Sequence, residues 1–286
     1  MTQYKKPNVK LIRAKNKISS FIGVIAKIAV CIMFLFPFYW MIITSFKTFA
    51  ESVQVPPTLW PQNFTLDAFI TVFGKMNFGR YIGNTVFLLV VVTTIRIILM
   101  VPTAYAFARM KFVGRDIMFG LLMVAFMVPT CLTFITTYRM FANSSLMDSF
   151  WPQILPCICH AYGIFMLRQT FMQVPEELIE SARLDEANEL KIITKIMLPM
   201  AKSTMATVTF LSITGTWNAY FWPLVITLND KYRPITIAIE KLKSLEDGLV
   251  WPTIMAGNLI LLLPIIIAFL AASKKIISSM AYRGVK

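Results

Sequence analysis

The stretch ESARLDEANELKIITKIMLP, Glu180 to Pro199, is charged and amphipathic, although it lies between two long apolar runs. Six of the 14 acidic residues of the chain fall between Glu176 and Glu189. Pro175 and the acids after it suit the first turn of a helix, and Pro199 predicts a stop or a kink farther on. We therefore expect two short helices joined by a turn.

Apolar residues recur at three- and four-residue spacing along both halves of this segment. Such spacing predicts that each helix buries one face and leaves the other polar. The residues expected on the buried faces are Leu178, Ile179 and Ala182 in the first helix, and Ala187, Leu190, Ile193 and Met197 in the second.

The rest of the chain indicates a membrane protein. Of its 286 residues, 57% are apolar and 15% are charged, and the mean hydropathy is positive. Six apolar runs each reach the roughly 20 residues that a helix needs to cross a bilayer, and they lack the alternation of a barrel strand. We expect an all-α membrane protein with six transmembrane helices, at about 21–46, 84–108, 117–138, 151–172, 203–228 and 251–273.

The charge distribution orients these helices. The net charge is +14, but the greater part of the Lys and Arg residues falls on one side of the six spans, together with both termini. This positive-inside bias places both termini in the cytoplasm and implies no nucleic-acid partner. The first span is too long for the apolar core of a signal peptide, so we expect a retained anchor. The expected organisation is a cytoplasmic tail (1–20), a six-span transmembrane domain (21–273) with a cytoplasmic loop (173–202), and a second cytoplasmic tail (274–286).

The acidic segment lies on the side of the membrane where acids are otherwise scarce, and this location has to be explained. Helices that lie on lipid generally carry Lys and Arg on their polar face, whereas anionic headgroups would repel this one. Docking of a protein partner explains the acids better, and capping of the helix bundle is the alternative.

The same segment resembles the EAA loop of binding-protein-dependent ABC importer permeases. That loop reads E-A-A, three residues, G, and about nine residues later I-x-L-P. Glu180, Ser181 and Ala182 match its start, and the segment ends on the matching Ile196, Leu198 and Pro199. Further stretches resemble the carbohydrate-uptake branch, and above all the smaller permease of maltose-type importers: PFYWMIITSFKT (37–48), AYAFARMKFVGRD (104–116), FGLLMVAFMVPT (119–130), GIFMLRQTFMQVPEELIESARLDEA (163–187) and TWNAYFWPLV (216–225).

One position departs from the family pattern. Glu186 stands where the family has glycine. Glycine there lets the chain turn with a positive φ, which glutamate adopts only at a cost. We therefore expect a turn that is closer to helix or is shifted toward Asn188, because asparagine tolerates left-handed geometry.

The resemblance implies the type I ABC importer permease fold, with the EAA loop as a coupling helix that docks in a cleft of a cytoplasmic ATPase. It implies a polar contact for Glu180, packing for Ser181 and Ala182, and a capping role for Asp185. The implied coupling residues are Glu180, Ser181, Ala182, Arg183, Asp185, Glu186 and Ala187.

The resemblance also implies the partners of an importer in the bacterial cytoplasmic (inner) membrane. They are a second permease that completes the solute pathway, two copies of the cytoplasmic ABC ATPase, and an extracytoplasmic solute-binding protein. The chain lacks G-x-x-x-x-G-K-[ST], so no cofactor is expected in it, and ATP and Mg²⁺ would be bound by the partner ATPase.

Two features are candidates for contact with the solute. Arg96 lies in the middle of the second apolar run, where a cation is expensive in lipid. It is either a contact for substrate or an anion, or a structural cation satisfied by carbonyls or by the partner chain. A polar cluster around Gly215 either lines the pathway or packs and hydrogen-bonds between helices. Its candidate pathway residues are Thr216, Trp217, Asn218 and Tyr220.

A stand-alone carrier or channel driven by an ion gradient is the alternative function. Such carriers commonly need a carboxylate at membrane depth, and none of the six expected spans contains Asp or Glu. A membrane enzyme is disfavoured because no convincing set of nucleophile, base or metal ligands is present. The sequence therefore favours a carbohydrate importer permease without identifying the solute.

Overall fold

The computed structural model describes residues 9–75, 77–144, 146–243 and 248–281. Within these residues every regular element is a helix, in agreement with the expected all-α class. The contacts divide the chain into two compact units, Met1–Val72 with Leu249–Leu259 and Phe73–Gly248 with Ile260–Lys286.

The first unit contains α1 (Val9–Ser45) and α2 (Phe49–Ser52), and it shares α3 (Asp67–Lys75) and α15 (Trp251–Ala281) with the second unit. The part of α1 from Ile22 to Ser45 is long and apolar enough to span a membrane. Most of its side chains between Ile22 and Phe38 are exposed within the protein, as expected for a helix that contacts lipid or another chain.

A buried acid organises the proline-rich segment after α2. The carboxylate of Glu51 accepts hydrogen bonds from the hydroxyl of Thr58 at 2.7 Å and from the backbone amides of Gln62 and Asn63 at 2.9 and 3.4 Å. Burial alone would raise the pKa of Glu51, but these hydrogen bonds and the charge of Lys47 outweigh it and lower the pKa. The segment is thus folded back onto the helix end that precedes it.

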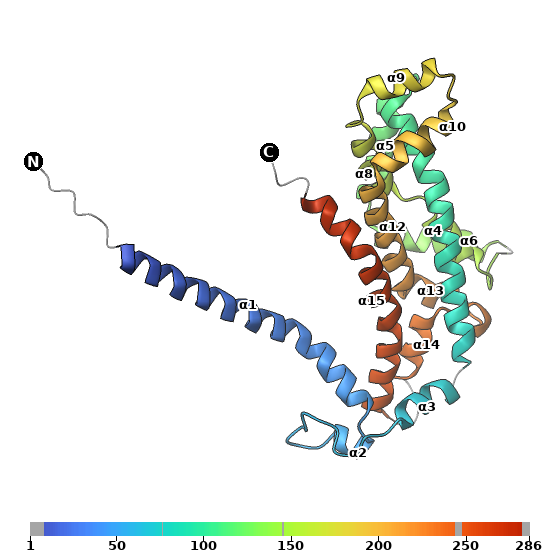
Figure 1. Ribbon diagram of the computed structural model, residues 1–286. Helices are drawn as coiled ribbons and strands as arrows, with labels where there is room; N and C mark the ends of the chain where they lie inside the picture. Colours follow the sequence, from blue (N-terminus) through green and yellow to red (C-terminus); the bar gives the residue numbers. More distant parts are fainter. Residues whose placement is uncertain (1–8, 76, 145, 244–247, 282–286) are drawn as a thin grey trace, which may run out of the picture. The chain divides into compact units, whose positions relative to one another are not determined.

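The second unit is a bundle around one long helix, α4, with two short helices, α9 and α10, at one end of it (Figure 1). Its elements are α4 (Phe78–Arg109), α5 (Arg115–Met127), α6 (Thr130–Ala142), α7 (Trp151–Ile154), η1 (Leu155–Cys157), α8 (Ala161–Phe171), α9 (Glu176–Leu184), α10 (Glu189–Ile192), η2 (Ile193–Met197), α11 (Leu198–Met200), α12 (Lys202–Trp217), α13 (Phe221–Ile226), η3 (Asp230–Tyr232), α14 (Ile235–Lys241) and most of α15.

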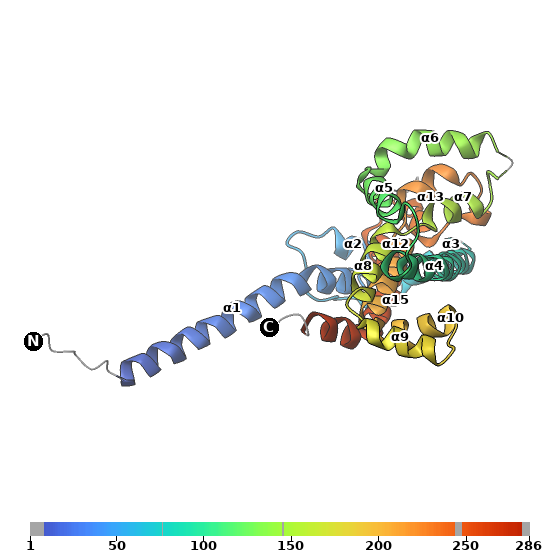
Figure 2. The same ribbon diagram turned by 90° about the horizontal axis from the view of Figure 1, so that it is seen from above.

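The core of this unit lies between α4, α8 and α12. It continues beneath α9 and α10, where Ile179 and Ile192 are fully buried against it. Figure 2 shows α6 at the periphery of the unit, beyond α7 and α13. The ring of Phe134 on α6 packs on those of Phe221 and Trp222, with centroids 4.9 and 5.9 Å apart. The α9–α10 end is therefore built on the core formed by α4, α8 and α12.

The expected six spans are confirmed only in part. Three described helices are long and apolar enough to cross a membrane, namely Ile22–Ser45, Phe78–Arg109 and Trp251–Leu270. Two bent pairs raise this number to five if each pair is one span: α5 with α6, bent by 94°, and Glu189–Met200 with α12, bent by 86°.

The expected span at 151–172 is wrong as a continuous helix. It consists of α7, the 3-10 turn η1 and α8, with a break before Ala161. Pro156 lies inside η1 and cannot donate a helical hydrogen bond, and His160 is extended at φ −124°. The proline therefore ends one helix and a second one starts. The expected span at 203–228 is likewise interrupted, between α12 and α13.

Candidate functional site

The helix α9 begins and ends with recognisable local signals. Pro175 precedes the first turn, and the acids Glu176 and Glu177 lie at the positive end of the helix dipole. At its other end, the N–H of Ala187 donates to the carbonyl of Ala182 at 2.9 Å, and the N–H of Glu186 donates to the carbonyl of Arg183 at 3.0 Å. These two bonds form a Schellman motif, which ends the helix and reverses the chain.

Glu186 occupies the left-handed position of this motif, at φ 58°. The expectation of a turn that avoids this geometry, or shifts it to Asn188, is wrong. Asn188 instead caps α10, where its side-chain oxygen accepts the N–H of Lys191 at 2.9 Å. The turn therefore keeps the shape that suits glycine, and glutamate bears a conformational cost of about 1 kcal/mol there.

We call the segment from α9 to α11 (Glu176–Met200) the hairpin. Its second arm contains the π-helical turn η2. The N–H of Leu198 donates to the carbonyl of Ile193, five residues back. This wide turn directly precedes Pro199, whose ring would clash with the carbonyl four residues earlier in a regular helix. The chain then bends by 86° at Ala201 into α12, so the kink expected at the proline lies two residues later.

The apolar residues expected on the inner face are buried only in part. Ile192 and Ile193 are buried together, whereas Leu190, expected on the buried face, is 68% exposed. Ile193 and Met197, also expected inside, are buried. Leu178, also expected inside, is 44% exposed, while its neighbour Ile179 is fully buried.

Arg109, at the end of α4, anchors the start of the hairpin. Its Nε and one terminal nitrogen donate to the carbonyl of Phe171 at 3.1 and 2.7 Å, and that nitrogen also donates to the carbonyl of Val174. The other terminal nitrogen pairs with the carboxylate of Glu176. One side chain therefore satisfies the end of α8, the connecting segment and the first turn of α9.

A second contact from α4 holds the other arm. The hydroxyl of Tyr105, a fully buried side chain, donates to the carboxylate of Glu189. The other oxygen of Glu189 accepts a hydrogen bond from Arg183 at 3.2 Å, which links the two arms of the hairpin. The slight burial of Arg183 would lower its pKa, but the charge and hydrogen bond of Glu189 dominate and raise it.

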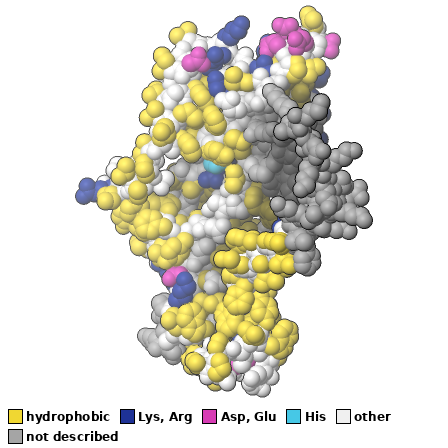
Figure 3. Space-filling model, turned by 90° about the vertical axis from the view of Figure 1, so that its left-hand side faces the viewer, with side chains coloured by type: hydrophobic (Ala, Val, Ile, Leu, Met, Phe, Trp, Pro, Cys, Tyr) yellow, Lys and Arg dark blue, Asp and Glu magenta, His cyan; other side chains and the backbone are white. Residues whose placement is uncertain are grey.

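The hairpin presents most of the expected coupling residues on its outer surface. Glu180 has no hydrogen bond or ion pair to any described residue, and Leu184 beside it in the helix is 85% exposed. Ala182 and Ala187 instead pack against the core. The exposed members of the expected set are Glu180, Ser181, Arg183, Asp185 and Glu186. Figure 3 shows acidic and basic side chains gathered over this end, next to a largely apolar surface.

The candidate pathway residues lie in three different places. Arg96 and Thr216 line one cavity of about 270 Å³ between α4, α7, α12 and α13. Trp217 is buried on the other side of α12, where its indole nitrogen donates to the carbonyl of Leu261 at 3.0 Å. Asn218 and Tyr220 are exposed in the break between α12 and α13.

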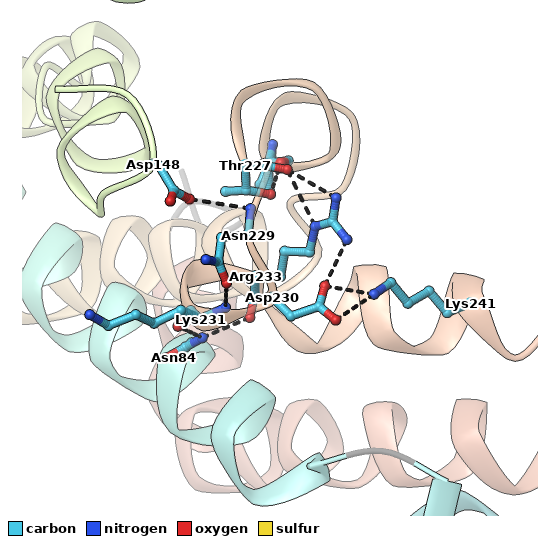
Figure 4. Close-up of polar contacts among 9 residues, drawn as sticks. Asn84, Asp148, Thr227, Asn229, Asp230, Lys231, Arg233 and Lys241 are labelled. Atoms are coloured by element: carbon cyan, nitrogen blue, oxygen red, sulfur yellow. Dashed lines mark hydrogen bonds and ion pairs between the residues drawn. The ribbon is translucent and has the colours of Figure 1, made fainter. Parts of the chain in front are cut away.

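The opposite end of α4 carries a separate polar network (Figure 4). Asp230 accepts hydrogen bonds from Lys241 at 2.6 and 2.7 Å and from Arg233 at 2.7 Å, and the amide of Asn84 on α4 donates to two carbonyls of the same loop at 2.8 and 2.9 Å. Burial would raise the pKa of Asp230, but the hydrogen bonds from Lys241, Tyr81 and Arg233 outweigh it and lower the pKa. The network fixes the loop between α13 and α14 onto the long helix.

Several site residues carry no local sequence signal. Arg109 and Tyr105 hold partners 67 and 84 residues away, a distance over which helical periodicity says nothing. Gln153 and His160 line the cavity with Arg96, but each is a single polar residue in an apolar run. The one available signal for Arg109 is its basic character at the end of a long apolar helix, which equally fits a surface residue.

The comparisons with known proteins agree with this arrangement. A family model described as the inner membrane component of binding-protein-dependent transport systems matches residues 100–276, which include the whole hairpin and its anchors. The chain belongs to this family.

Curated relatives of this transport component match most of the chain. An arabinooligosaccharide transport system permease protein (AraQ) of Halalkalibacterium halodurans is 27% identical over 277 residues, covering 96% of this chain and 99% of the relative. Protein LplC of Bacillus subtilis is 30% identical over 211 residues, covering 74% and 71%. An sn-glycerol-3-phosphate transport system permease protein (UgpE) of Rhizobium meliloti is 25% identical over 258 residues, covering 87% and 92%.

Solved structures show the same fold. A chain in the crystal structure of a bacterial ABC transporter involved in the import of the acidic polysaccharide alginate has a TM-score of 0.81 and 22% identity, covering 96% of this chain and 99% of that one. A chain in a structure of the alginate transporter in complex with an alginate pentasaccharide-bound periplasmic protein has a TM-score of 0.51 and 18% identity, covering 90% and 93%. The fold of this chain is that of an ABC importer permease.

The strained turn of this transport component gives a first prediction. Replacing Glu186 with glycine removes the left-handed strain and is expected to stabilise the α9–α10 turn by about 0.5–1 kcal/mol. Hydrogen exchange of the Ala187 amide, which closes the Schellman motif, should slow accordingly. Asp185→Gly is the matched control, because Asp185 has φ −79° and glycine there brings only extra flexibility to the unfolded chain. Equal effects of the two glycines would show that no strain is stored at Glu186.

Proposed function

We propose that the chain is the permease subunit of an ABC importer for a carbohydrate or a related solute, and that α9 couples it to a cytoplasmic ATPase. The observation that carries this proposal is the α9–α11 hairpin. Its exposed face combines Glu180, an acid with no partner among the described residues, with an exposed leucine, Leu184, while its inner face is fixed to α4 by Arg109 and Tyr105.

Rigid attachment is what a force-transmitting joint requires. A partner that pulls on α9 also pulls on α4, because Arg109 and Tyr105 of α4 hold Glu176 and Glu189 of the hairpin. The helix α4 is the central helix of the second unit. Movement of the hairpin is then shared by the long helix beside the cavity, because tightly packed interiors transmit strain. The ATPase supplies energy by preferring one arrangement of the permease over the other.

The other subunits follow from the same assignment. A second permease would complete the solute pathway, two ATPase copies would bind ATP and Mg²⁺, and an extracytoplasmic binding protein would deliver the solute. Family membership supports this assembly, since the family is named for binding-protein-dependent transport. The solute class is supported by relatives named for arabinooligosaccharide and glycerol phosphate transport. We place the hairpin and both termini in the cytoplasm on the positive-inside bias.

The test is to replace Glu180 with lysine in the full-length permease. We expect normal insertion into the membrane, loss of co-purification with the ATPase subunit, and loss of uptake across a panel of labelled sugars, because a reversed charge would meet the ATPase site that receives the carboxylate. Glu180→Gln should have a smaller effect, since it keeps the shape and one acceptor oxygen.

Asp116→Lys is the matched control, because it reverses an exposed acid at the start of α5, outside the hairpin. It is expected to leave uptake and co-purification near those of the unmodified protein. Undisturbed uptake in the Glu180→Lys variant would refute coupling through this residue. Transport by the purified permease without any ATPase would favour a stand-alone carrier instead.

A further inference from the structure

The cavity beside Arg96 has an unusual composition for the middle of an apolar bundle. It lies within the second unit, encloses about 270 Å³ and is reached by side chains of α4, α7, α12 and α13. Apolar residues form most of its wall, and a few polar groups converge on it. The polar and aromatic residues used below are Arg96, Gln153, His160, Thr216 and Trp222.

Arg96 brings an uncompensated positive charge to this cavity. Its Nε donates to the carbonyl of Cys157, and one terminal nitrogen donates to the hydroxyl of Ser212 at 2.8 Å. The second terminal nitrogen has no hydrogen-bond partner among the described residues, and the cavity wall contains no carboxylate. The two neutral contacts orient the guanidinium but leave its charge unbalanced, so an anion at this position would be strongly favoured.

Three further polar atoms, on residues that line the cavity, are buried without a partner in the described protein: the side-chain oxygen of Gln153, Nδ1 of His160 and the hydroxyl of Thr216. Gln153 is only 4% exposed, and its nitrogen is already committed to the carbonyl of Tyr232 at 2.9 Å. A buried polar atom without a partner costs free energy, so a ligand that forms hydrogen bonds with these atoms removes that cost and binds more tightly. Hydroxyl groups can both donate and accept, and they suit all three atoms.

An indole ring completes the wall. The nitrogen of Trp222 donates to the carbonyl of Pro152 at 2.7 Å, which fixes the ring at the cavity edge. A fixed aromatic face offers apolar contact to the C–H face of a sugar ring. Figure 3 shows a histidine and a basic side chain visible together within the apolar surface.

We propose that this cavity binds an anionic sugar unit of the transported solute, with its carboxylate or phosphate on Arg96, its hydroxyls on Gln153, His160 and Thr216, and its ring against Trp222. This inference rests on the proposed transport function and narrows its solute class to acidic carbohydrates. The volume is slightly below the roughly 300–1,000 Å³ of pockets for drug-sized ligands, which matches one ring rather than a chain of several.

The experiment measures equilibrium binding to the full-length permease, assembled with its partner subunits in nanodiscs, by isothermal titration calorimetry. The probes are D-glucuronate and D-glucose 6-phosphate, with neutral D-glucose as the matched reference and acetate and inorganic phosphate as simple anions. We expect at least one anionic sugar to bind at least about tenfold more tightly than glucose and than its own simple anion. Whichever of the two binds better identifies carboxylate or phosphate as the preferred charge.

Variants distinguish the effect of the Arg96 charge on binding from an effect on folding. Arg96→Gln is expected to reduce the preference for the anionic sugar to about onefold, and Arg96→Lys to keep part of it, because lysine retains the charge without the planar donors. Arg139→Gln, which removes an exposed cation on α6, should leave the preference unchanged. If Arg96→Gln does not fold, the ratio measured in the unmodified protein still decides the matter.

Equal binding of glucose and both anionic sugars would overturn the proposal and leave a water-filled cavity with a structural arginine. Simple anions that bind as tightly as the sugars would overturn the sugar part of it. The Glu180→Lys variant should keep the preference while losing transport. Failure of this site and failure of the coupling mechanism are thereby distinguishable.

Discussion

Replacing Arg109 with methionine is expected to detach α9 from the bundle and to abolish coupling. Methionine has a similar length and no donors, so it leaves the carbonyl of Val174 without the donor that Arg109 supplies, and that of Phe171 with only the backbone N–H of Val174 at 3.3 Å. An unsatisfied buried acceptor costs about 1–3 kcal/mol, which predicts a loss of up to about 3 kcal/mol in unfolding free energy.

The ion pair with Glu176 contributes little to this loss. The Glu176 side chain is 51% exposed, and half-exposed pairs contribute no more than about 1 kcal/mol. Glu176→Gln should therefore be mild, although it removes the same ion pair. This contrast between the two variants separates the role of the backbone carbonyls from that of the charge.

Thermal unfolding in nanodiscs and co-purification with the ATPase measure the two parts of the prediction. Arg115→Met is the matched control, because Arg115 pairs with an exposed acid just beyond α4 and its loss should cost less than about 1 kcal/mol. If Arg109→Met unfolds like Arg115→Met and still binds the ATPase, then the hairpin is held by its apolar face alone.

The hairpin shows which features a sequence can specify. Pro175, the acids after it and the helical spacing predict a helix, a turn and a second helix, and the structure confirms that order. Which apolar residues point inward was predicted less well. Leu190 and Leu178 are exposed, whereas Ile179, Ile193 and Met197 are buried as predicted, because helical spacing selects a face of a helix but not how much of that face its neighbours cover.

The turn at Glu186 shows that a local conformational preference can be outweighed. Glutamate by itself prefers a negative φ, and this preference led us to expect a shifted turn. The two Schellman hydrogen bonds and the burial of Ala187 outweigh a cost of about 1 kcal/mol at one residue. Tertiary contacts decide such a conformation, so the sequence alone could identify the departure but not its outcome.

The broken span between Trp151 and Phe171 had a visible signal in Pro156, but its apolar composition suggested a single helix. The composition of a segment indicates whether it prefers lipid. It does not indicate whether the helical hydrogen bonds of its backbone are continuous. The break turns out to matter, since it places the carbonyl of Cys157 where Arg96 can reach it. A continuous helix would have used that carbonyl for its own hydrogen bonds.

Replacing Gly163 with leucine is expected to prevent α4 and α8 from packing, with the largest loss of stability of any single change considered. A Cβ at Gly163 would overlap Sδ of Met100 and lie 2.5 Å from Nδ1 of His160. Small residues allow close approach of membrane helices, and Met100 is only 3% exposed, so it has little room to move. Even Gly163→Ala should cost about 1–3 kcal/mol, the usual range for overpacking, and leucine should cost more.

The cause can be tested by a double-mutant cycle with Met100→Ala. That change alone should cost about 2–5 kcal/mol, because it leaves a cavity in the core. Combined with Gly163→Ala, it removes the overlapping sulfur, so the double variant should be more stable than the sum of the two losses predicts. Gly215→Ala is the matched control on α12, since a Cβ there meets nothing within 4 Å. Strict additivity in the cycle would mean that Gly163 is needed for some reason other than the close approach of α8 to Met100, and a large loss at Gly215 would mean that any added methyl group disturbs these helices.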